Sequence, residues 1–474
     1  ALNSRNPRLA TRHGNTALGT KIECYKGNVG SGKHITMAVN QAEFAGKVEK
    51  IVGKKNVILS EAQRRSSSKD CYHFSPVLVP QLEEKFADVI ARPQTQDQLR
   101  DLISCAAAYK IPITPRGAGT GNYGQGVPLR GGLMISTRDL NKIIEISTEE
   151  ARVEAGVILQ DIEKAAESVS AELRCFPSTM PTSHTGGFIS GGSGGVGSIQ
   201  WGMLREADNV RHARILTIEE EPKFLDLERS QLGGVLHNCG LTCFVSEVTL
   251  GLAPLVPWQQ YVIAFDDFFS ALAAAEKIAL DDEIKKRLVT VFEWPIPSYF
   301  IPLVKKGAMP EGKSVLFLYT DEAHDFVEDL AAGLGGRITF HEPPKTSVKR
   351  GTQIYDYTWN HTTQWAMKAD PKLTYLQDRF SNEPGRVAEQ IRERKKLFPE
   401  VLEHIEFIKD GGVVVPGALS IVRFSSKNRL WELIDWCENN GIRVANPHTH
   451  FLDEDTRWYG DEHLARKLEW DPYA

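Results

Sequence analysis

Apolar side chains between residues 95 and 169 switch between the spacing of a helix and the spacing of a strand. Residues 95–110 open with a capping box and then repeat apolar positions on one helical face, which predicts a helix. Two short apolar runs, "IPITP" at 111–115 and "GGLMIST" at 131–137, predict strands. "RVEAGVIL" at 152–159 alternates like a half-buried strand, and residues 160–169 return to helical spacing. The first half of the chain should therefore mix helices and strands.

A second region with its own pattern begins near residue 256. Three apolar runs predict strands, and they are "YVIAFDD" at 261–267, "SVLFLYTD" at 314–321 and "ALSIVRFSS" at 418–426. Residues 268–280 and 428–440 are amphipathic at helical spacing. Because 474 residues exceed one ordinary core, we interpret this region as a separate α+β unit.

Composition narrows the class of protein. A content of 41% hydrophobic and 25% charged residues is typical of a folded chain, and no apolar run reaches the length of a transmembrane helix. The formal net charge of -5 argues against a nucleic-acid partner. Seven scattered cysteines argue against a disulfide framework, so we expect an intracellular protein, cytoplasmic or organellar. Residues 1–22 contain basic residues and no acid, as a targeting remnant or a disordered tail would.

Residues 27–33, "GNVGSGK", have the spacing of a P-loop. His34 stands where the motif needs a Ser or Thr for Mg²⁺, and the preceding "KIECYK" is a poor strand. A P-loop nucleotidase is therefore a disfavoured alternative.

Two glycine-rich segments follow, and they carry the most specific signal. Residues 117–132 hold seven glycines, a density that lets several backbone N–H groups converge on an anion. Residues 119–124 fit G-x-G-x-x-G, but a strand follows where a nicotinamide-binding fold needs a helix. The second segment is "CFPSTMPTSHTGGFISGGSGGVGSIQWG", residues 175–202.

Four motifs together give the chain a family resemblance: "PRGAGTGNYGQG", "TGGFISGGSGGVGS", "WGMLREADNV" and "HNCGLTCFVSEVTLGLAP". The chain resembles the FAD-linked oxidases typified by vanillyl-alcohol oxidase, p-cresol methylhydroxylase and D-lactate dehydrogenase, over roughly residues 50–255, with a fainter echo in "KLEWDPYA". The resemblance implies an α+β fold, with a two-subdomain FAD-binding domain of p-cresol methylhydroxylase type and an α+β cap domain with an antiparallel sheet. The expected parts are an N-terminal extension (1–45), the FAD-binding domain (46–256), the substrate cap (257–440) and a C-terminal segment (441–474) that returns to the FAD domain.

The resemblance also assigns FAD-binding positions. They are Arg116, Gly117, Ala118, Gly119, Thr120, Gly121, Asn122, Gln125, Gly126, Pro177, Ser178, Thr185, Gly186, Gly187, Ile189, Gly192, Ser198, Gly202 and Val245. Relatives that bind FAD covalently use a His and a Cys where this chain has Ala118 and Met180, so noncovalent FAD is expected. A C-terminal histidine could still provide a link.

Candidate catalytic residues come from the cap and the C-terminal segment. His361, His448 and His450 are candidate bases, because a histidine pKa suits proton transfer near neutrality. Arg423 is the candidate clamp for a substrate carboxylate, with an ion pair to Glu406 as the alternative. Tyr357 is a further candidate catalytic residue. Asp453 and Asp455 could complete a metal site with the two C-terminal histidines, but we predict no metal.

These observations predict an FAD-dependent oxidoreductase with a small-molecule substrate. It would transfer hydride from a hydroxyl-bearing carbon, with 2-hydroxy acids as one substrate class, to the flavin. Reoxidation would use O₂ or another acceptor, so an oxidase and a dehydrogenase both stay open. A flavin-dependent oxidative cyclase or desaturase of a secondary metabolite and a noncatalytic flavin-binding protein are alternatives.

Overall fold

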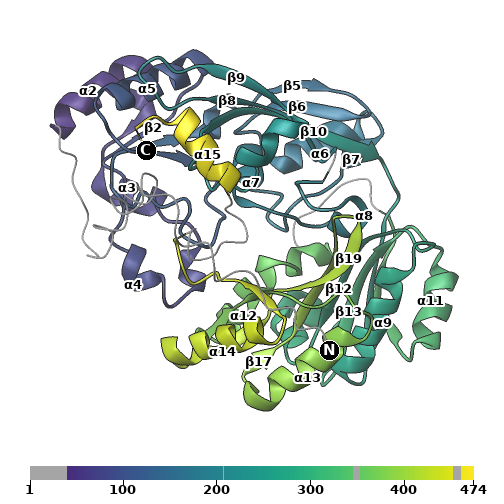
Figure 1. Cartoon of the computed structure of the whole chain (residues 1–474). Coiled ribbons are helices and arrows are strands. Elements are labelled where there is room, and N and C mark those ends of the chain that lie inside the picture. The colour runs from purple at the N-terminus through teal and green to yellow at the C-terminus, as the bar shows by residue number, and fades with distance from the viewer. Residues whose placement is uncertain (1–39, 207, 345–352, 452–460, 474) are drawn as a thin grey trace, which may run out of the picture.

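The computed structural model describes residues 40–206, 208–344, 353–451 and 461–473. Two units lie against each other, and we call residues 40–256 the first unit and residues 257–451 the second unit (Figure 1). Helix α15 (Asp461–Trp470) returns to the first unit, where it packs on the 3₁₀ helix Arg229–Gly234.

The first unit contains two small sheets. One has the order β1-β2-β4-β3, and its three strands β2, β4 and β3 are parallel. Helices α2 and α5 pack on it through apolar side chains such as Phe44 and Leu102. The bounds are β1 Val57–Ile58, β2 Val89–Ala91, β3 Ile113–Arg116, β4 Leu133–Ser136, α2 Gln41–Val52, α3 Glu61–Ser67, α4 Val79–Leu82 and α5 Gln96–Ala108.

The second sheet of the first unit is antiparallel, with the order β5-β6-β10-β8-β9, and β7 also pairs with β10. The strand expected at 152–159 ends at Glu154, because Gly156 packs against the Thr137 and Leu140 carbonyls, where no side chain fits. The bounds are β5 Ile143–Ile146, β6 Glu150–Glu154, β7 Ala171–Leu173, β8 Val210–Leu216, β9 Phe224–Glu228, β10 Phe244–Pro254, α6 Leu159–Glu167, α7 Thr185–Gly191 and α8 Ser198–Trp201.

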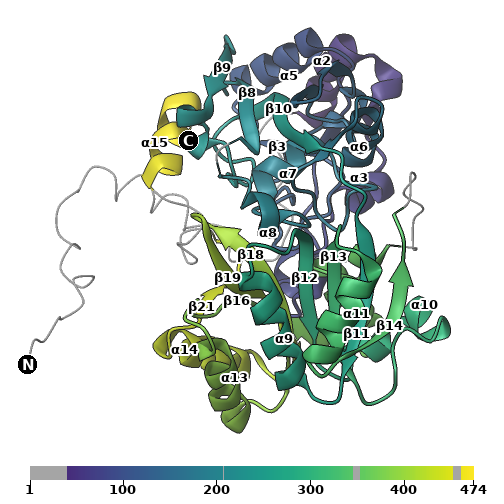
Figure 2. The same ribbon diagram turned by 90° about the vertical axis from the view of Figure 1, so that its right-hand side faces the viewer.

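An eight-stranded antiparallel sheet forms the second unit, in the order β14-β11-β13-β12-β18-β19-β16-β21 (Figure 2). A smaller sheet β15-β20-β17 lies beside it. Sheet bounds are β11 Gln259–Phe265, β12 Lys286–Phe292, β13 Ser314–Thr320, β14 Arg337–Glu342, β15 Leu373–Tyr375, β16 Gln377–Arg379, β17 Val401–Leu402, β18 His404–Asp410, β19 Val413–Ala418, β20 Ile421–Arg423 and β21 Arg443–Ala445. Helix bounds are α9 Phe268–Leu280, α10 Ile301–Lys305, α11 His324–Gly333, α12 Asn360–Ala369, α13 Arg386–Leu397 and α14 Lys427–Asn439.

Three features differ from those expected from the sequence. Helix α2 starts at Gln41, inside the expected extension, because its own side chains Phe44 and Val48 are buried. Strand β21 falls in the expected C-terminal segment but forms the edge of the large sheet, paired with β16. The run 418–426, expected as one strand, passes from β19 to β20, because buried Ser420 turns to bind Asp378.

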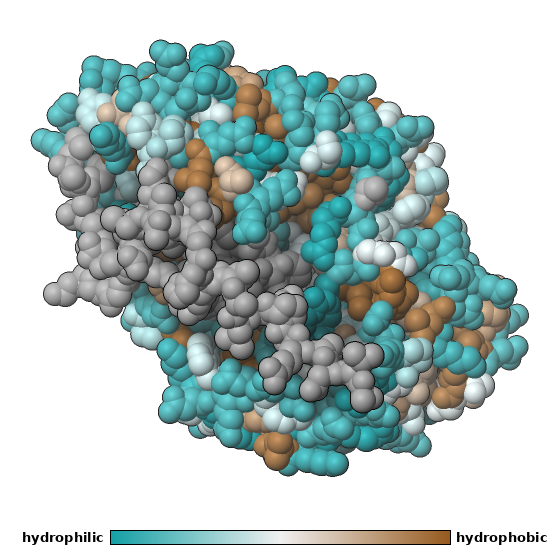
Figure 3. Space-filling view, viewed as in Figure 1, coloured by the Kyte–Doolittle hydropathy of each residue, from teal (hydrophilic) through white to brown (hydrophobic). Residues whose placement is uncertain are grey.

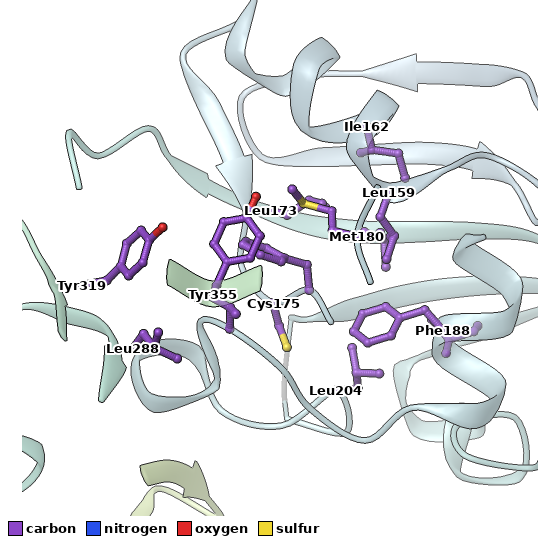
Figure 4. Close-up of a cluster of buried hydrophobic side chains, with 14 of the residues drawn as sticks. Leu159, Ile162, Leu173, Cys175, Met180, Phe188, Leu204, Leu288, Tyr319 and Tyr355 are labelled. Carbon is purple, nitrogen blue, oxygen red and sulfur yellow. The ribbon is translucent and has the colours of Figure 1, made fainter. Parts of the chain in front are cut away.

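Strand alternation gives the large sheet two different faces. Leu316 and Leu318 of β13 contact the outer cluster that contains helices α9, α11, α13 and α14. Val315 and Phe317 point the other way and join the core of the first unit. This shared core is shown in Figure 4, where Leu288, Tyr319 and Tyr355 of the second unit lie near Leu173, Cys175 and Met180 of the first. The two units therefore share one continuous apolar core.

A buried charge also joins the units. Arg287 of β12 forms ion pairs with Glu172 at 3.2 Å and Glu163 at 3.6 Å, and it donates to the Leu173 carbonyl at 2.6 Å. All three side chains are less than a tenth exposed. The Trp258 indole also donates to Glu172. Burial raises the pKa of Glu163 to about 7, although Arg287 acts in the opposite direction.

Hydrophilic residues cover most of the described surface on the face shown in Figure 3, with apolar residues in small groups. Among the described helices, none has the length and apolar content needed to cross a membrane.

Arg287→Met is expected to lower the free energy of unfolding by about 3–5 kcal/mol, because two carboxylates would stay buried without their counter-charge. Urea unfolding measures the change. The control is Arg386→Met, which removes an exposed ion pair to Glu389 and should cost under about 1 kcal/mol. Equal losses of unfolding free energy in the two variants would show that the buried ion pairs of Arg287 contribute no more to stability than an exposed ion pair.

Candidate functional site

A cavity of about 430 Å³ lies between the two glycine-rich segments of the first unit and the inner face of the large sheet. Its lining includes residues 115–123, 125 and 126 at the end of β3 and after it, residues 183, 184, 186–188 and 190–194 around α7, and parts of β16, β18, β19 and β21. Both units therefore contribute walls to one site.

The first glycine segment is held by a buried charge network. Arg116 donates through Nη1 to the Gly126 carbonyl at 3.2 Å and through Nη2 to the Lys69 carbonyl. Asp70 accepts from the backbone N–H groups of Tyr72 and Gly126. Burial raises the pKa of Asp70 to about 6, and Arg116 opposes that shift. These bonds close residues 116–126 into a fixed loop.

Gly119 is required by this arrangement. Its φ is +73°, and a Cβ there would lie 2.0 Å from Nη2 of Arg116. The anchored guanidinium leaves room only for glycine.

The second glycine segment lies directly against the first. A Cβ at Gly117 would lie 3.6 Å from the Cα of Gly187, and the hydroxyls of Thr120 and Ser183 are 3.3 Å apart. His184 lies beneath the contact, with Nδ1 3.4 Å from the Thr137 hydroxyl. Burial, with lesser contributions from Arg138 and Arg116, lowers the His184 pKa to about 4, so the ring is neutral.

The opposite wall carries polar side chains from β18. His404, Glu406, Ile408 and Asp410 alternate with Ile405 and Phe407, which face the outer cluster. Glu406, Ile408 and Asp410 line the cavity, and His404 lies behind Glu406. The sequence analysis missed these residues, although the alternation in "HIEFIKD" (404–410) predicts one polar face and could have identified them.

Two arginines meet at Asp410. Arg205 of the first unit contacts both carboxylate oxygens at 2.7 and 2.8 Å, and Arg379 of β16 contacts Oδ2. The two ion pairs lower the pKa of Asp410 despite the opposing effect of burial. Nearby, the Gly411 N–H donates to Glu206 at 2.6 Å, so the cavity rim joins both units.

Comparison with known proteins identifies part of the chain. Residues 87–221, which include both glycine-rich segments, match a family model described as an FAD binding domain. The chain carries an FAD-binding domain. Together with the relatives below, this match supports the predicted likeness to FAD-linked oxidases and confirms the predicted cofactor, FAD.

The relatives are distant and matched in part. An uncharacterized FAD-linked oxidoreductase of Mycobacterium tuberculosis is 27% identical over 50% of this chain and 52% of its own length. A glycolate oxidase subunit of Bacillus subtilis is 26% identical over 52% and 54%. A D-lactate dehydrogenase of Archaeoglobus fulgidus is 29% identical over 29% and 31%. The chain thus spans about half the length, or less, of these curated relatives.

Solved structures support the fold. A structure of alkyldihydroxyacetonephosphate synthase matches with a TM-score of 0.70 and 16% identity, covering 93% of this chain and 85% of that chain. At this identity the likeness concerns the mixed fold of helices and sheets alone.

Most residues predicted to bind FAD line the cavity. They are Arg116, Gly117, Ala118, Gly119, Thr120, Gly121, Asn122, Gln125, Gly126, Pro177, Ser178, Gly186, Gly187, Gly192 and Val245. The structure places the other four outside the lining. Thr185 donates to the Val157 carbonyl, Ile189 is in the apolar core, Ser198 bonds Gly195, and Gly202 ends α8.

The lining suits FAD in two respects. A Cβ built at Gly187 or Gly191 would meet no atom closer than 3.6 Å, so a ligand can approach the backbone closely at these two lining residues. The buried Nδ2 of Asn122 has no hydrogen-bond partner within the described parts of the chain, so it could donate to a bound group.

The residues expected to be catalytic lie outside the lining. Arg423 is on the surface, paired with Asp370 at 2.5 Å rather than with Glu406. Tyr357 is buried against Phe300 and Trp365, and burial raises its pKa to about 12. His361 is in the first turn of α12, directly after the lining residues Trp359 and Asn360.

The two C-terminal histidines differ in their surroundings. His448 is 1% exposed, and its Nε2–H donates to the Tyr375 carbonyl at 2.9 Å while Nδ1 accepts from Ser75. The Cβ of His450 lies 3.6 Å from a Cβ built at Gly124. Residues 27–33, the rest of the tail up to 39, Asp453 and Asp455 lie outside the described residues.

Gly119→Ala is expected to weaken FAD binding about ten-fold or more, because the guanidinium of Arg116 must leave its carbonyl partners. The FAD content of the purified protein measures this. Gly312→Ala is the matched control, since Gly312 has the same φ of +73° and no atom within 4 Å of a built Cβ. Full FAD content in both variants would contradict the close-approach explanation.

His448→Gln is expected to change stability rather than chemistry. Burial lowers the His448 pKa to about 4, below its ordinary 6.5, so the unfolded chain binds more protons between these values. Stability is complete above about pH 6.5 and falls as the pH drops towards 4. Urea unfolding at pH 7.5 and 5 should show a smaller pH loss in the variant. A slowed flavin reduction at pH 7.5 would return His448 to a catalytic role.

Proposed function

We propose that the protein is an FAD-dependent oxidoreductase that takes hydride from a hydroxyl-bearing carbon of a small molecule. The first unit would be an FAD-binding domain of p-cresol methylhydroxylase type, and the second unit would be a cap over the substrate. The observation that carries the proposal is the single cavity with glycine loops on one side and polar side chains of the large sheet on the other.

The chain's own residues suit these roles. Loop residues from Arg116 to Gly121, together with Gly186 and Gly187, would hold the pyrophosphate through backbone N–H groups. FAD, when bound, supplies the acceptor for a hydride. Polar groups on β16 and β18 would bind and orient the substrate, and the shared apolar core would keep bulk water out.

The relatives' names guide the choice of substrate. A glycolate oxidase subunit and a D-lactate dehydrogenase both have names that refer to 2-hydroxy acids. Arg379 and Arg205 would favour such an anionic substrate. The first tests should therefore use glycolate and D-lactate.

The purified protein is expected to be yellow and to release FAD into the supernatant on acid precipitation. Ala118 carries no nucleophile, Met180 is buried in the core, and both ring nitrogens of His448 are engaged. A visible spectrum before and after precipitation measures the released flavin. A yellow pellet would show a covalent link and contradict noncovalent binding.

Anaerobic mixing with glycolate or D-lactate then tests the reaction, with bleaching of the flavin absorbance as the expected result. Bound FAD that no hydroxyl compound bleaches would contradict the proposed function and favour a noncatalytic flavin-binding role or an oxidative cyclase. Copurified ATP without flavin would revive the P-loop alternative.

A further inference from the structure

One row of paired residues crosses the large sheet at the cavity. Thr290 pairs with Glu406, Glu406 with Gly417, Gly417 with Arg379, and Arg379 with Arg443. Paired residues of neighbouring strands direct their side chains to the same face. Glu406, Gly417, Arg379 and Arg443 all line the cavity.

Gly417 leaves a gap in this row. Adjacent strands lie about 4.8 Å apart, so the backbones at Glu406 and Arg379 are about 10 Å apart across Gly417. A Cβ at Gly417 would meet no atom closer than 3.5 Å, and its backbone is not in the left-handed region. Neither strain nor crowding explains the glycine, whereas space for a ligand does.

Glu406 is a fixed, buried carboxylate beside the gap. Its Oε1 accepts from the Trp359 N–H and from Nε2 of His404, both at 2.8 Å, and its Oε2 accepts from the Thr290 hydroxyl. Glu406 is 2% exposed. A carboxylate has about four acceptor positions, so Oε2 keeps one for a further proton donor.

Trp359 and Asn360 add polar atoms near the same carboxylate. Trp359 has φ +52°, a costly conformation for a residue with a bulky side chain. Its indole Nε1 and the Oδ1 of Asn360 are buried, and within the described part of the structure they have no hydrogen-bond partner. Both residues line the cavity. A bound ligand would satisfy these atoms.

Arg379 provides a cation on the other side of the gap. Asp410 orients its guanidinium at the cavity wall. A guanidinium held in this way can bind a carboxylate through two parallel N–H donors.

We propose that a 2-hydroxy carboxylate binds over Gly417, with its carboxylate on Arg379 and its hydroxyl on Oε2 of Glu406. Glu406 accepts the hydroxyl proton and becomes a carboxylic acid. The substrate carbon loses its C–H hydride, with two electrons, to FAD, and the C–O single bond becomes the carbonyl of a 2-oxo acid. His404 is a positioning residue that holds the carboxylate in place. This assignment rests on the proposed function.

The first test is Glu406→Gln, which keeps the size of the side chain and removes the proton acceptor. Anaerobic flavin reduction by the better of glycolate and D-lactate should slow at least about 100-fold, with FAD content unchanged. Glu328→Gln, an exposed change on helix α11, is the control and should react like the wild type. A wild-type reduction rate in Glu406→Gln would overturn the assignment and leave the proposed function intact. Loss of FAD from Glu406→Gln would also overturn it, because Glu406 would then serve the cofactor.

The second test measures binding without turnover. Oxalate has no C–H bond to donate, so its titration against the flavin spectrum reports occupation of the gap. Gly417→Leu should abolish the spectral response, and Arg379→Lys should weaken binding about ten-fold because two parallel contacts become one. Gly333→Leu, a change at the end of helix α11 with no atom within 4 Å of a built Cβ, should respond like the wild type. An unchanged oxalate response in Gly417→Leu would overturn the proposed position.

Failure of the two proposals can be told apart. Wild-type protein that holds FAD but is reduced by neither acid, and whose spectrum oxalate does not change, would overturn the substrate assignment together with the proposed reaction. Wild-type reduction with unaffected Glu406 and Gly417 variants would overturn only the assignment.

Discussion

The position of the large sheet on the first unit depends on one buried charge. Arg287 enters the first unit from β12 and meets Glu172 and Glu163 where all three are almost completely shielded from water. A buried guanidinium of this kind is tolerated only when its partners are in place, so the contact favours one docking geometry. The apolar core shared around Tyr355 and Cys175 surrounds this ion pair. Together they set the distance between the glycine loops and β18, and that distance creates the cavity.

The chemistry of the cavity wall follows from the two faces of the large sheet. Alternate side chains of β12, β13 and β18 go to the helix-covered outer core, so the others must face the first unit. Far from the glycine loops these inner positions are apolar, as with Phe317. Next to the loops they include the carboxylates Glu406 and Asp410, with Ile408 between them. Each of these carboxylates is held by donors from more than one element, which stabilises its charge at the border of the site.

The glycine loops could be predicted because their signal is local. Gly119 needs a positive φ and an anchored arginine three residues earlier, and both requirements lie within a few residues of the same loop. Which histidine could be the catalytic base could not be predicted from local sequence in the same way. His448 looks like a candidate base in isolation, but its two ring nitrogens form hydrogen bonds with Ser75, 373 residues earlier, and with the Tyr375 carbonyl. Arg423 was a candidate carboxylate clamp on a predicted apolar strand, yet β20 lies in the small side sheet, where this side chain faces solvent.

The mixed fold and the two glycine-rich loops could be predicted from the sequence alone, because they depend on short-range spacing and on glycine backbone freedom. The FAD-linked oxidase type was predicted from a resemblance that four sequence motifs carry. The tertiary structure alone decided which polar side chains meet at the site. Glu406, Gly417 and Arg379 come from three strands, and only the register of the sheet places them in one row. Register arises from the packing of both faces at once, so no single stretch of the chain encodes it.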